Sequence, residues 1–531
     1  MEKITTDIFS FENLRKGGYV YVDKTDLLWR LAAEQEGRQF FLSRPRRFGK
    51  SLMLSTFKCI FEGRRELFKG LRIDRLKYDW QAYPVVMLNM AEVVAPTVEK
   101  LRENLSDMVD GLISEFKLKD VRKVSEPGKC LGNFFKALAE AKGEFVVLVD
   151  EYDMPMQGFF GDRRALLAVR KVMHVFYLAL KNNEANVRFL MLTGVTKLTK
   201  VSVFSGLNHL TDLTMKRREY ATLLGYTPKE IEAFFPKRLD ALAKRSKVDR
   251  KRALKRLLDW YDSYRFSPDT TARVCNPISI GQALANRALK SYWVGTAMAS
   301  LVMERIAAAG KTPEDFEGCT ATEDELDLCD ALKLPAKSLM YQSGYLTIKG
   351  LSRTEVDGIG NPKLILGAPN HEVRGAIRDG WFDCIINVPA TEFDALVDVA
   401  KRQVAAGDAD SLINETLYRV YAKIPPEWKI LNEADVKRHF RLFMEMLGAK
   451  VAAEEGSARG YADAIIETKT FVWVFEFKFN RSAKAAIAQI REKGYANPFK
   501  GDKRPVTLVG INFRTAKRNI DEPVFGKLKA S

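Results

Sequence analysis

The sequence predicts an α/β protein of several domains: a parallel sheet at the N-terminus, a mainly helical middle, and a second, smaller α/β domain at the C-terminus. Three observations support this prediction. Short apolar runs alternate with amphipathic stretches over roughly the first 215 residues. The pattern turns helical from about Arg217, and strand-like runs return near the C-terminus. The chain, at 531 residues, is also too long for one ordinary core, so we expect three or four units.

The N-terminal sheet is predicted from runs rich in Val, Leu, Phe and Met, the pattern of strands that are buried on both faces. These runs are Phe40–Ser43, Pro84–Met90, Phe145–Val149 and Val187–Thr193. Parallel strands need crossover helices between them. Amphipathic stretches in the right places meet this need: Ser51–Phe61, Val98–Phe116 and Arg163–Leu180.

The middle of the chain is predicted to be helical. Thr227 and Glu230 stand at capping-box spacing, and Arg250–Tyr264 repeats apolar positions at helical intervals. Prolines break the pattern over Phe266–Pro277, and Ser338–Gly350 ends in a strand-like run. We therefore expect a helical lid followed by a winged-helix-like region.

The C-terminal domain is predicted after the break at Pro425 and Pro426. A helix over Asn432–Leu447 is followed by strands over Ala462–Ile466 and Phe471–Phe477, then by a helix and the strand Pro505–Ile511. The predicted domains are 1–216, a core built on the parallel sheet; 217–352, the lid and winged-helix-like region; 353–426, a helical connector; and 427–531, a smaller α/β domain.

Composition excludes several classes of protein. With 46% hydrophobic and 29% charged residues, the chain is neither collagen-like nor largely disordered. Its apolar runs are far shorter than the roughly 20 residues of a membrane span, and its start lacks a secretory pattern, so we expect a cytoplasmic protein that does not cross a membrane. Six scattered cysteines and four distant histidines signal neither a disulfide scaffold nor a zinc site.

The net charge of +17 favours polyanionic partners. Residues 423–531 carry 21 Lys and Arg against 13 Asp and Glu, nearly half of the excess in a fifth of the chain. A charge that serves only solubility explains the same composition.

The run SRPRRFGKSL at Ser43–Leu52 follows a predicted strand and opens a predicted helix, the context in which GKS indicates phosphate binding. Gly49 permits close approach of the backbone, Lys50 neutralises phosphate charge and Ser51 is a candidate magnesium ligand. Arg44 stands where a full Walker A pattern has glycine, so the loop is not a standard one, and an exposed basic loop is the alternative. The predicted phosphate-binding residues are Arg46, Arg47, Phe48, Gly49, Lys50, Ser51 and Leu52.

The run EFVVLVDEYD at Glu144–Asp153 has the Walker B layout, a hydrophobic strand that ends in two acidic residues. In this layout Asp150 holds magnesium and Glu151 acts as general base toward water. Thr193 ends a neighbouring predicted strand, where a polar side chain can sense the γ-phosphate, and Thr196 is the runner-up. Acidic pairs also end strands by chance, but the joint occurrence with GKS favours a nucleotide site.

The C-terminal run GYADAIIETKTFVWVFEFKF places Asp463 at the start of one strand and Glu476 and Lys478 in the next. Twofold alternation puts Glu476 and Lys478 on one face, and a hairpin brings Asp463 beside them. Two carboxylates and a lysine form a metal-dependent hydrolase constellation, in which the carboxylates bind magnesium and the lysine positions water. A surface ion pair on a half-exposed strand is the alternative.

These motifs together resemble the AAA-ATPase-like proteins of bacteria that are often fused to a PD-(D/E)xK nuclease-like domain. The resemblance covers nearly the whole chain and includes GYVYVDKTDLL at Gly18, FFLSRPRRFGKSL at Phe40, FVVLVDEYDMP at Phe145, LTGVTKLTKVSVFSGLNHLTDLT at Leu192, CNPISI at Cys275, YQSGYLTIKG at Tyr341 and PNHEVR at Pro369. In that family the RPRRFGKS loop is the usual form. The resemblance implies a P-loop NTPase fold with a restriction-endonuclease-like C-terminal domain, and it implies ATP and Mg²⁺ as cofactors.

The resemblance also implies further residues. Glu433, in the helix before Asp463, matches a metal-binding glutamate of PD-(D/E)xK nucleases, and Gln489 matches a glutamine in the following helix. Relatives read GRxD before the first strand, whereas this chain has Tyr461 in place of the arginine, which leaves an altered substrate contact open. Asp23, Lys24 and Thr25 stand where such folds contact adenine or ribose; a helix N-terminal cap is the alternative.

We therefore expect an ATP-binding, ATP-hydrolysing protein coupled to a magnesium-dependent nuclease-like domain. Nucleic acid is the expected partner, with DNA ranked ahead of RNA, and a homo-oligomer is left open. The rival from another class is a nucleotide-switched interaction protein whose nuclease-like domain binds nucleic acid without cleaving it.

Overall fold

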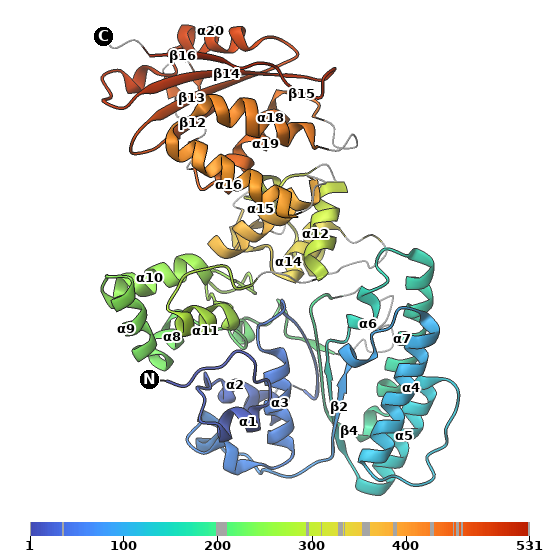
Figure 1. Ribbon diagram of the computed structural model, residues 1–531. Helices are drawn as coiled ribbons and strands as arrows, with labels where there is room; N and C mark the ends of the chain where they lie inside the picture. The colour runs from blue at the N-terminus through green and yellow to red at the C-terminus, as the bar shows by residue number, and fades with distance from the viewer. Residues whose placement is uncertain are drawn as a thin grey trace. The chain divides into compact units, whose positions relative to one another are not determined.

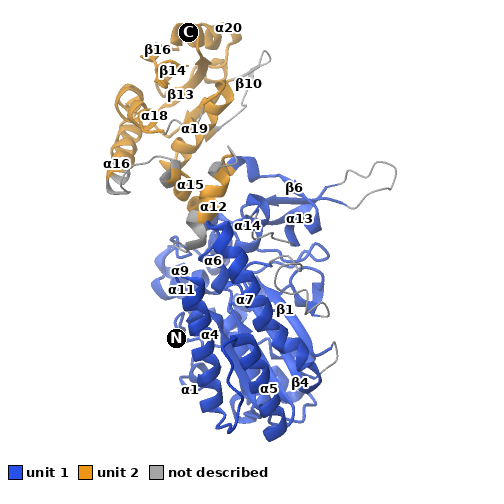
Figure 2. Ribbon diagram, turned by 90° about the vertical axis from the view of Figure 1, so that its right-hand side faces the viewer, with its two compact units in different colours: residues 1–298, 314–374 blue, residues 299–313, 375–531 orange. Residues whose placement is uncertain are grey.

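The computed structural model describes residues 2–33, 37–197, 210–293, 297–308, 311–327, 333, 335–352, 362–385, 390–424, 430–449, 451–452, 456–457 and 460–528. The chain divides into two compact units, residues 1–298 with 314–374, and residues 299–313 with 375–531 (Figure 2). The predicted boundary at Pro425 and Pro426 lies outside the described residues, as do Cys329 and His209, and the four predicted domains stay a prediction.

The core of the first unit is a parallel five-stranded sheet, as predicted. Its strand order is β2-β3-β4-β1-β5, so that β4 lies between β3 and β1. The strands are β2 (Val85–Asn89), β3 (Phe145–Asp150), β4 (Val187–Gly194), β1 (Gln39–Ser43) and β5 (Thr211–Asp212). All six residues of β3 are buried, which explains its unbroken apolar run.

Helices cover both faces of this sheet (Figure 1). On one face lie α1 (Phe11–Lys16), α2 (Thr25–Ala32) and α3 (Lys50–Phe61), and on the other lie α4 (Val98–Glu115), α5 (Pro127–Lys142) and α7 (Arg163–Asn182). The short helix α6 (Met154–Gln157) follows β3. Because all four predicted strands end at one edge of the sheet, the loops after β1, β3 and β4 lie together there.

A group of helices follows the sheet in the region predicted as a lid, and it is called the lid below. It contains α8 (Pro228–Phe234), α9 (Pro236–Arg245), α10 (Arg250–Tyr261) and α11 (Pro277–Asn286), which share one apolar core. The predicted capping box at Thr227 and Glu230 is present. Helix α10 ends three residues earlier than predicted, because Tyr264 instead pairs with Val274 in an isolated β-bridge.

The first unit also contains a small helix-and-sheet region. Two helices, α13 (Glu323–Asp327) and α14 (Ala336–Ser343), accompany a three-stranded antiparallel sheet of β6 (Thr320–Ala321), β8 (Leu364–Gly367) and β7 (Thr347–Leu351). These are the kinds of element expected of a winged-helix-like region, and that assignment stays a prediction.

The second unit holds a mixed sheet of order β15-β14-β13-β12-β9, with β16 also paired to β14. Its strands are β9 (Val451–Ala452), β12 (Ala464–Glu467), β13 (Val472–Phe479), β14 (Val506–Arg514), β15 (Asn519–Ile520) and β16 (Val524–Lys527). Helices packed with it include α18 (Tyr418–Ala422), α19 (Glu433–Met446) and α20 (Ala483–Lys493).

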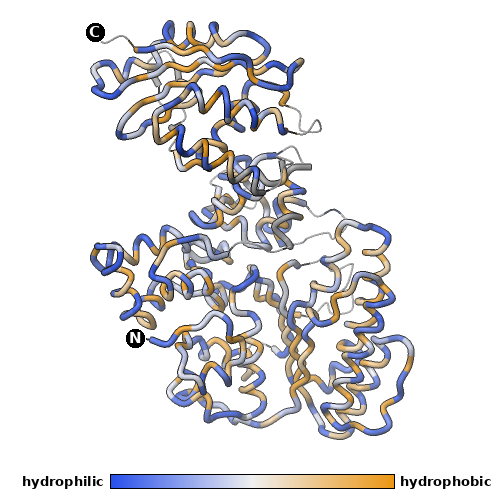
Figure 3. Tube along the Cα trace, viewed as in Figure 1, coloured by the Kyte–Doolittle hydropathy of each residue, from blue (hydrophilic) through white to orange (hydrophobic). Residues whose placement is uncertain are grey.

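The faces of β13 follow the predicted alternation. Phe440 of α19 packs on Phe475 and Phe477, with ring centroids 4.7 and 4.9 Å apart, whereas Val474 belongs to an apolar cluster with residues of α20. In Figure 3 the long strands of both sheets carry the colour of hydrophobic residues. Among the residues that the structure describes, no helix is long and apolar enough to cross a membrane.

Candidate functional site

The predicted phosphate-binding loop lies between β1 and α3. Gly49 is the residue before the first turn of α3 and adopts a left-handed conformation, with φ 94° and ψ 22°. Glycine adopts this conformation without strain, and a Cβ built there meets no atom within 4 Å. The first backbone N–H groups of α3, from Lys50, Ser51 and Leu52, have no acceptor within the helix, an arrangement that suits an anion.

Arg44, the departure from the Walker A pattern, is a buried structural residue. Its side chain is 1% exposed and donates hydrogen bonds to the carbonyl oxygens of Ser43, Thr214 and Tyr220 at 2.9, 2.8 and 3.4 Å. The guanidinium also lies over the ring of Phe266, 4.2 Å from its centroid. Burial lowers the pKa of Arg44 to about 10. The arginine thus ties the base of the loop to the segment after β5.

Lys50, the first residue of α3, folds back onto its own loop. Its ammonium donates to the carbonyl oxygens of Arg44 and Pro45 at 2.9 and 3.1 Å. Burial lowers the pKa of Lys50, and the negative charges of Asp150 and Glu151 oppose that effect. The lysine is therefore within electrostatic reach of the acidic pair that ends β3.

Asp150 and Thr193 join the ends of two neighbouring strands. Thr193 Oγ1 donates to Asp150 Oδ1 at 2.6 Å, and the Glu151 N–H donates to the same oxygen at 3.0 Å. Glu151 is half-buried and has a positive φ of 51°. Burial raises the pKa of Glu151, and the positive charge of Lys50 opposes this effect because it stabilises the ionised carboxylate. Asp150, Glu151, Thr193 and Lys50 are thus gathered at the carboxyl edge of the sheet, where they were predicted to meet.

Asp153 is a buried acidic residue of this edge that the sequence reasoning missed. It is 0% exposed and accepts hydrogen bonds from the N–H groups of Val195 and Thr196 at 3.2 and 2.8 Å. The hydroxyl of Thr196 also donates to Asp153, so this runner-up residue supports the loop rather than Asp150. A Cβ at Gly194 would lie 2.6 Å from Asp153, which explains the glycine there. Local sequence does not distinguish Asp153 from the other two acids of DEYD.

The remaining predicted loop residues have different surroundings. Arg46 is half-buried and donates to Met154 and Gln157 of α6, at 3.2 and 3.0 Å. Arg47 is exposed, has a positive φ of 67° and donates to a carbonyl of the lid. Phe48 is buried against Tyr264 and Phe266, so its role is packing. Ser51 and Leu52 are half-buried in the first turn of α3.

Asp23 and Lys24, in the segment YVDKT before β1, form hydrogen bonds and an ion pair with other residues of the protein. Asp23 accepts hydrogen bonds from both the N–H and the hydroxyl of Thr25, at 2.9 and 2.7 Å, and from the Arg72 N–H at 2.7 Å. Lys24 is buried and pairs with Glu230 of α8 at 2.9 Å. Asp23 thus binds the first N–H of α2, although the N-cap residue is Lys24 and no side chain caps the helix there. The pair of Lys24 with Glu230 ties the segment to the lid.

A narrow cavity of 80 Å³ lies beside the first turn of α3. Phe48, Gly49 and Leu52 line one side of it, and residues of the N-terminal segment and the lid, such as Tyr21, Leu224 and Tyr226, line the rest. It is smaller than the roughly 300–1,000 Å³ of common ligand pockets.

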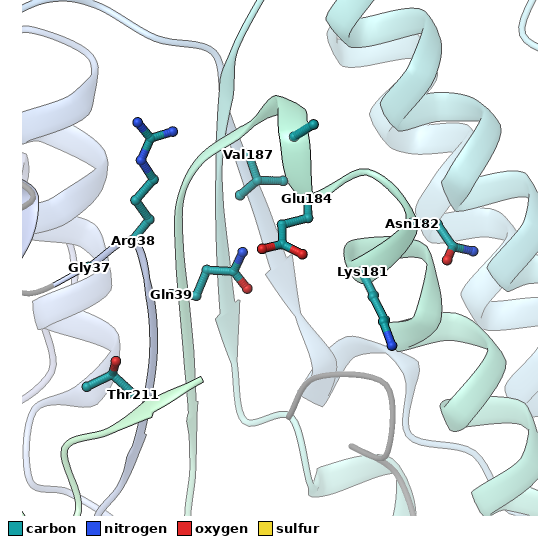
Figure 4. A pocket seen from close by; sticks show the side chains of 9 residues that line it. Gly37, Arg38, Gln39, Lys181, Asn182, Glu184, Val187 and Thr211 are labelled. Carbon is teal, nitrogen blue, oxygen red and sulfur yellow. The ribbon is translucent and has the colours of Figure 1, made fainter. Parts of the chain in front are cut away.

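A second cavity, of 730 Å³, lies at the opposite edge of the same sheet (Figure 4). Arg38, Gln39, Lys181 and Glu184 contribute to its polar lining. Because Gln39 and Val187 are the first residues of the parallel strands β1 and β4, this cavity faces away from the phosphate-binding loop.

The predicted C-terminal constellation forms around the hairpin of β12 and β13. The pairing of the two strands ends at Ala464 and Phe475, and Asp463 then accepts the Phe477 N–H at 2.8 Å. Glu476 is 1% exposed and accepts a hydrogen bond of 2.8 Å from the buried Lys478. The hairpin therefore brings Asp463, Glu476 and Lys478 together.

Helix α19 adds two residues to this cluster. Glu433, which the resemblance implies as a metal ligand, lies in the first turn of α19, and its carboxylate is 3.9 Å from the ammonium of Lys478. Lys437, one turn further on, was missed: its ammonium lies 2.9 Å from Glu433 and 2.6 Å from Asp463. The i,i+4 spacing of Glu433 and Lys437 is visible in the sequence, whereas the contact with Asp463 depends on how α19 packs.

The donor set of this cluster fits a divalent cation in its chemistry. Glu476 Oε2 is buried and has no hydrogen-bond partner among the described residues. Burial, and then the charge of Asp463, raise the pKa of Glu476 to about 7. Carboxylate oxygens are the ligands that Mg²⁺ prefers. As the side chains stand, however, the described residues contain no group of three His, Cys, Asp or Glu arranged to hold a metal, and two lysines neutralise the cluster.

The sequence analysis also named Gln489, which the resemblance implies, and Tyr461, which replaces the arginine of relatives. Gln489 of α20 donates to the hydroxyl of Tyr495 at 3.2 Å. The side chain of Tyr461 lies outside what the structure describes.

Comparisons with known proteins give matches for both ends of the chain. A family model described as "Predicted AAA-ATPase" matches residues 5–204, and one described as "PD-(D/E)XK nuclease superfamily" matches residues 431–523. A relative from Azotobacter chroococcum mcd 1, "Uncharacterized protein in vnfD 5'region", is 30% identical over 533 residues, which are 98% of each chain.

Two solved structures were also matched. The Aeropyrum pernix ORC1 protein in complex with DNA is 12% identical, covers 67% of this chain and 90% of its own, and has a TM-score of 0.23. The ORC2 protein of the same organism, in ADPNP-ADP complexes, is 11% identical, with coverage of 84% and 86% and a TM-score of 0.25.

The full-length relative and the two family models agree with the predicted resemblance. The chain belongs to the family of AAA-ATPase-like proteins that carry a C-terminal domain of the PD-(D/E)XK nuclease superfamily.

Proposed function

We propose that the first unit binds and hydrolyses ATP. The observation that carries the proposal is the gathering of four features at one sheet edge: the N-terminus of α3, the Lys50 ammonium, the bonded pair of Asp150 and Thr193, and the half-buried Glu151. A cationic lysine beside an anion-binding helix terminus suits phosphates, and the acidic groups suit a metal and a water molecule.

Each residue has a role in this proposal. Lys50 exchanges the carbonyl oxygens of Arg44 and Pro45 for phosphate oxygens, which are stronger acceptors because they are charged. Ser51 and Asp150 hold Mg²⁺, which when bound neutralises phosphate charge. Glu151 accepts a proton from the attacking water, and its raised pKa makes it a stronger base than an exposed carboxylate. Thr193 orients Asp150 through their hydrogen bond.

Two substitutions test this site. Lys50→Ala is expected to abolish ATP binding, whereas Glu151→Gln keeps binding and stops turnover, because only the base is lost. Lys58→Ala, on the same helix two turns further on, is the matched control and should bind like wild type. Equilibrium binding of a labelled ATP analogue and phosphate release are measured on all three variants. Wild-type affinity in Lys50→Ala contradicts the phosphate-binding role of the loop.

We further propose that the C-terminal domain hydrolyses phosphodiester bonds of nucleic acid with Mg²⁺, with DNA ranked ahead of RNA. The carrying observation is the buried, unpartnered oxygen of Glu476 beside Asp463. In this proposal Glu433, Asp463 and Glu476 hold the metal, which when bound activates water and neutralises the scissile phosphate. Lys478 holds Glu476 in place and stabilises negative charge on the phosphate.

The nuclease proposal is tested with Asp463→Ala, Glu476→Gln and Lys478→Ala on labelled single- and double-stranded DNA and RNA. Magnesium, manganese or chelator is added, with or without ATP. All three variants should lose cleavage while the two carboxylate variants keep binding nucleic acid. Glu467→Gln, at the far end of β12, serves as the control and should cleave like wild type. Equal cleavage by Asp463→Ala and wild type places any activity outside this cluster.

One observation favours the second candidate, a nucleotide-switched protein with an inactive nuclease-like domain. Asp463 and Glu476 each already pair with an ammonium, from Lys437 and Lys478 at 2.6 and 2.8 Å. A protein of this kind binds nucleic acid in a nucleotide-dependent way but shows no cleavage under any of the conditions above, and the same assay therefore separates the two candidates.

A further inference from the structure

A concentrated basic surface lies on the lid, outside both sites described above. Residues 237–256, which form most of α9 and α10 and the turn between them, contain ten Lys and Arg but only two acidic residues, Asp240 and Asp249. Nine of the ten basic side chains are exposed. In Figure 3 this stretch, found by its place in Figure 1, is mostly the colour of hydrophilic residues.

The two acidic residues are already engaged within this basic hairpin. Arg250 of α10 pairs with Asp240 of α9, with Nε and Oδ1 2.6 Å apart, so the ion pair links the two helices. Asp249 caps α10 through the Arg252 N–H at 2.8 Å and also pairs with the Arg252 guanidinium. The hairpin is thus held in shape by its only two acids.

Among the described residues, Arg250 and Arg252 are the only cations of the hairpin that pair with an acid, and five of the others are unpartnered. Within the part of the chain that the structure describes, no ion pair or hydrogen bond engages the exposed side chains of Lys244, Lys247, Lys251, Lys255 and Arg256. Lys251 and Lys255 are one turn apart on α10, as are Arg252 and Arg256, and like charges at this spacing destabilise a helix. A surface that served only solubility would mix charges of both signs.

The apolar face of the hairpin decides between two polyanions, a membrane surface and a nucleic acid. Leu239, Leu242, Leu257 and Tyr261 are buried in the core of the lid, and none of the exposed large hydrophobic side chains lies on α9 or α10. A helix that lies on a membrane needs an exposed apolar face to insert. The surface is mainly cationic, its two acids are already paired, and it presents no exposed large hydrophobic side chain, which together suit a phosphate backbone.

We propose that the hairpin of α9 and α10 is a nucleic-acid-binding surface, which contacts the phosphates of a duplex without reading its sequence. The inference rests on the proposed function, because it takes nucleic acid as the partner. It adds a second contact surface, which lies on the first unit rather than on the nuclease-like domain.

The test neutralises four of the five unpartnered cations in the full-length protein: Lys244→Gln, Lys247→Gln, Lys251→Gln and Lys255→Gln together. A matched control neutralises four exposed lysines elsewhere in the same unit, Lys69, Lys119, Lys136 and Lys171. Binding of a labelled duplex is followed by fluorescence anisotropy at several salt concentrations. Each lost phosphate contact should reduce the magnitude of the slope of log K against log salt by about 0.9. For the hairpin variant we therefore expect a slope smaller in magnitude by about 2–4 and an affinity at least about tenfold weaker than that of wild type.

The outcomes separate this inference from the proposed function. If wild type binds duplex and the hairpin variant matches the control variant, the inference is wrong and the proposed function stands. If wild type binds no nucleic acid at low salt, the inference and the proposed action on nucleic acid are both wrong, whereas the ATPase proposal is unaffected. If the hairpin variant loses binding to anionic lipid vesicles but keeps duplex binding, the surface is a membrane contact and the inference is again wrong. Selective loss of duplex binding in the hairpin variant supports it.

Discussion

The hydroxyl of Thr193 donates a hydrogen bond of 2.6 Å to Asp150 Oδ1 and so joins the ends of β4 and β3. Both side chains are buried. The Glu151 N–H also donates to Asp150 Oδ1, whereas no described residue donates a hydrogen bond to Asp150 Oδ2. One oxygen of the carboxylate is therefore fixed by the protein and the other is not, as the proposed metal site requires.

This relationship predicts a selective defect in Thr193→Val, which keeps the shape of the side chain but removes its donor. ATP should bind within about threefold of wild type, whereas turnover should fall at least about tenfold, the effect of one hydrogen bond to a charged group. Thr193→Ser restores the hydroxyl and should restore turnover. Single-turnover hydrolysis and equilibrium binding distinguish the two effects, and equal turnover in the valine and serine variants contradicts the role assigned to the hydroxyl.

A second prediction concerns Arg44, which stands at a glycine position of the general Walker A pattern. Arg44→Gly restores that pattern, yet it should destabilise the first unit by about 2–4 kcal/mol, because three carbonyl oxygens lose a donor and a cavity opens beside Phe266. ATP affinity should fall as well, since the loop loses the side chain that ties its base to the segment after β5.

The neighbouring arginine provides the control for this prediction. Arg47 is exposed and makes one hydrogen bond, of 3.0 Å, to the carbonyl of Tyr292. Arg47→Gly should change the unfolding midpoint little, as most surface substitutions do. Thermal unfolding of both variants checks the contrast, and equal midpoints for the two variants are incompatible with a structural role for Arg44.

Much of the fold was predictable because buried strands and crossover helices carry strong local patterns. The apolar runs at Phe145 and Val187 could be little else than central strands, and a twofold pattern was enough to place Glu476 and Lys478 together. The hairpin geometry then placed Asp463 beside them. These predictions depend only on residues that are near one another in sequence.

The unpredicted parts depend on contacts between distant segments. Arg44 is buried by Thr214, 170 residues away, so no local pattern distinguishes it from the exposed Arg47. Lys437 meets Asp463 only because α19 packs against β13. The basic excess of the C-terminal domain was visible in composition, while the denser excess of α9 and α10 gained meaning only when the structure placed its apolar positions in the lid core.

A third prediction concerns Lys437, whose ammonium lies between Glu433 and Asp463. A divalent cation must compete with this ammonium for the same carboxylate oxygens. Lys437→Met is therefore expected to bind Mn²⁺ at least about tenfold more tightly than wild type, because one repulsive charge is removed at close range. Isothermal titration calorimetry with Mn²⁺ alone measures this affinity without any assay of cleavage.

The control for Lys437 lies one turn further along α19. Arg441 pairs with Glu445 at 3.0 Å, so Arg441→Met removes the same charge from the same helix but not from the carboxylate cluster. Its Mn²⁺ affinity should stay within about twofold of wild type. If the two variants bind Mn²⁺ equally, the effect is one of net charge and not of competition at Asp463.

The last prediction concerns the pH dependence of stability in the second unit. His439 of α19 lies 5.6 Å from the ring of Trp381, and its Nδ1 is buried without a hydrogen-bond partner among the described residues. Burial lowers the pKa of His439 to about 4 from its usual 6.5; Arg438 lowers it too, and Asp435 opposes them. Between these two values the unfolded chain takes up a proton that the folded chain does not, so stability falls as pH falls from 6.5 toward 4, by on the order of 2–3 kcal/mol over the full window.

His439→Phe and His439→Gln should both weaken this dependence while losing little stability at pH 7.5, where the imidazole is neutral in both states. Amide hydrogen exchange of peptides from α19, corrected for the intrinsic effect of pH on exchange, measures the opening free energy at each pH. If wild type and both variants lose protection in parallel as the pH is lowered, the acid sensitivity arises from other groups.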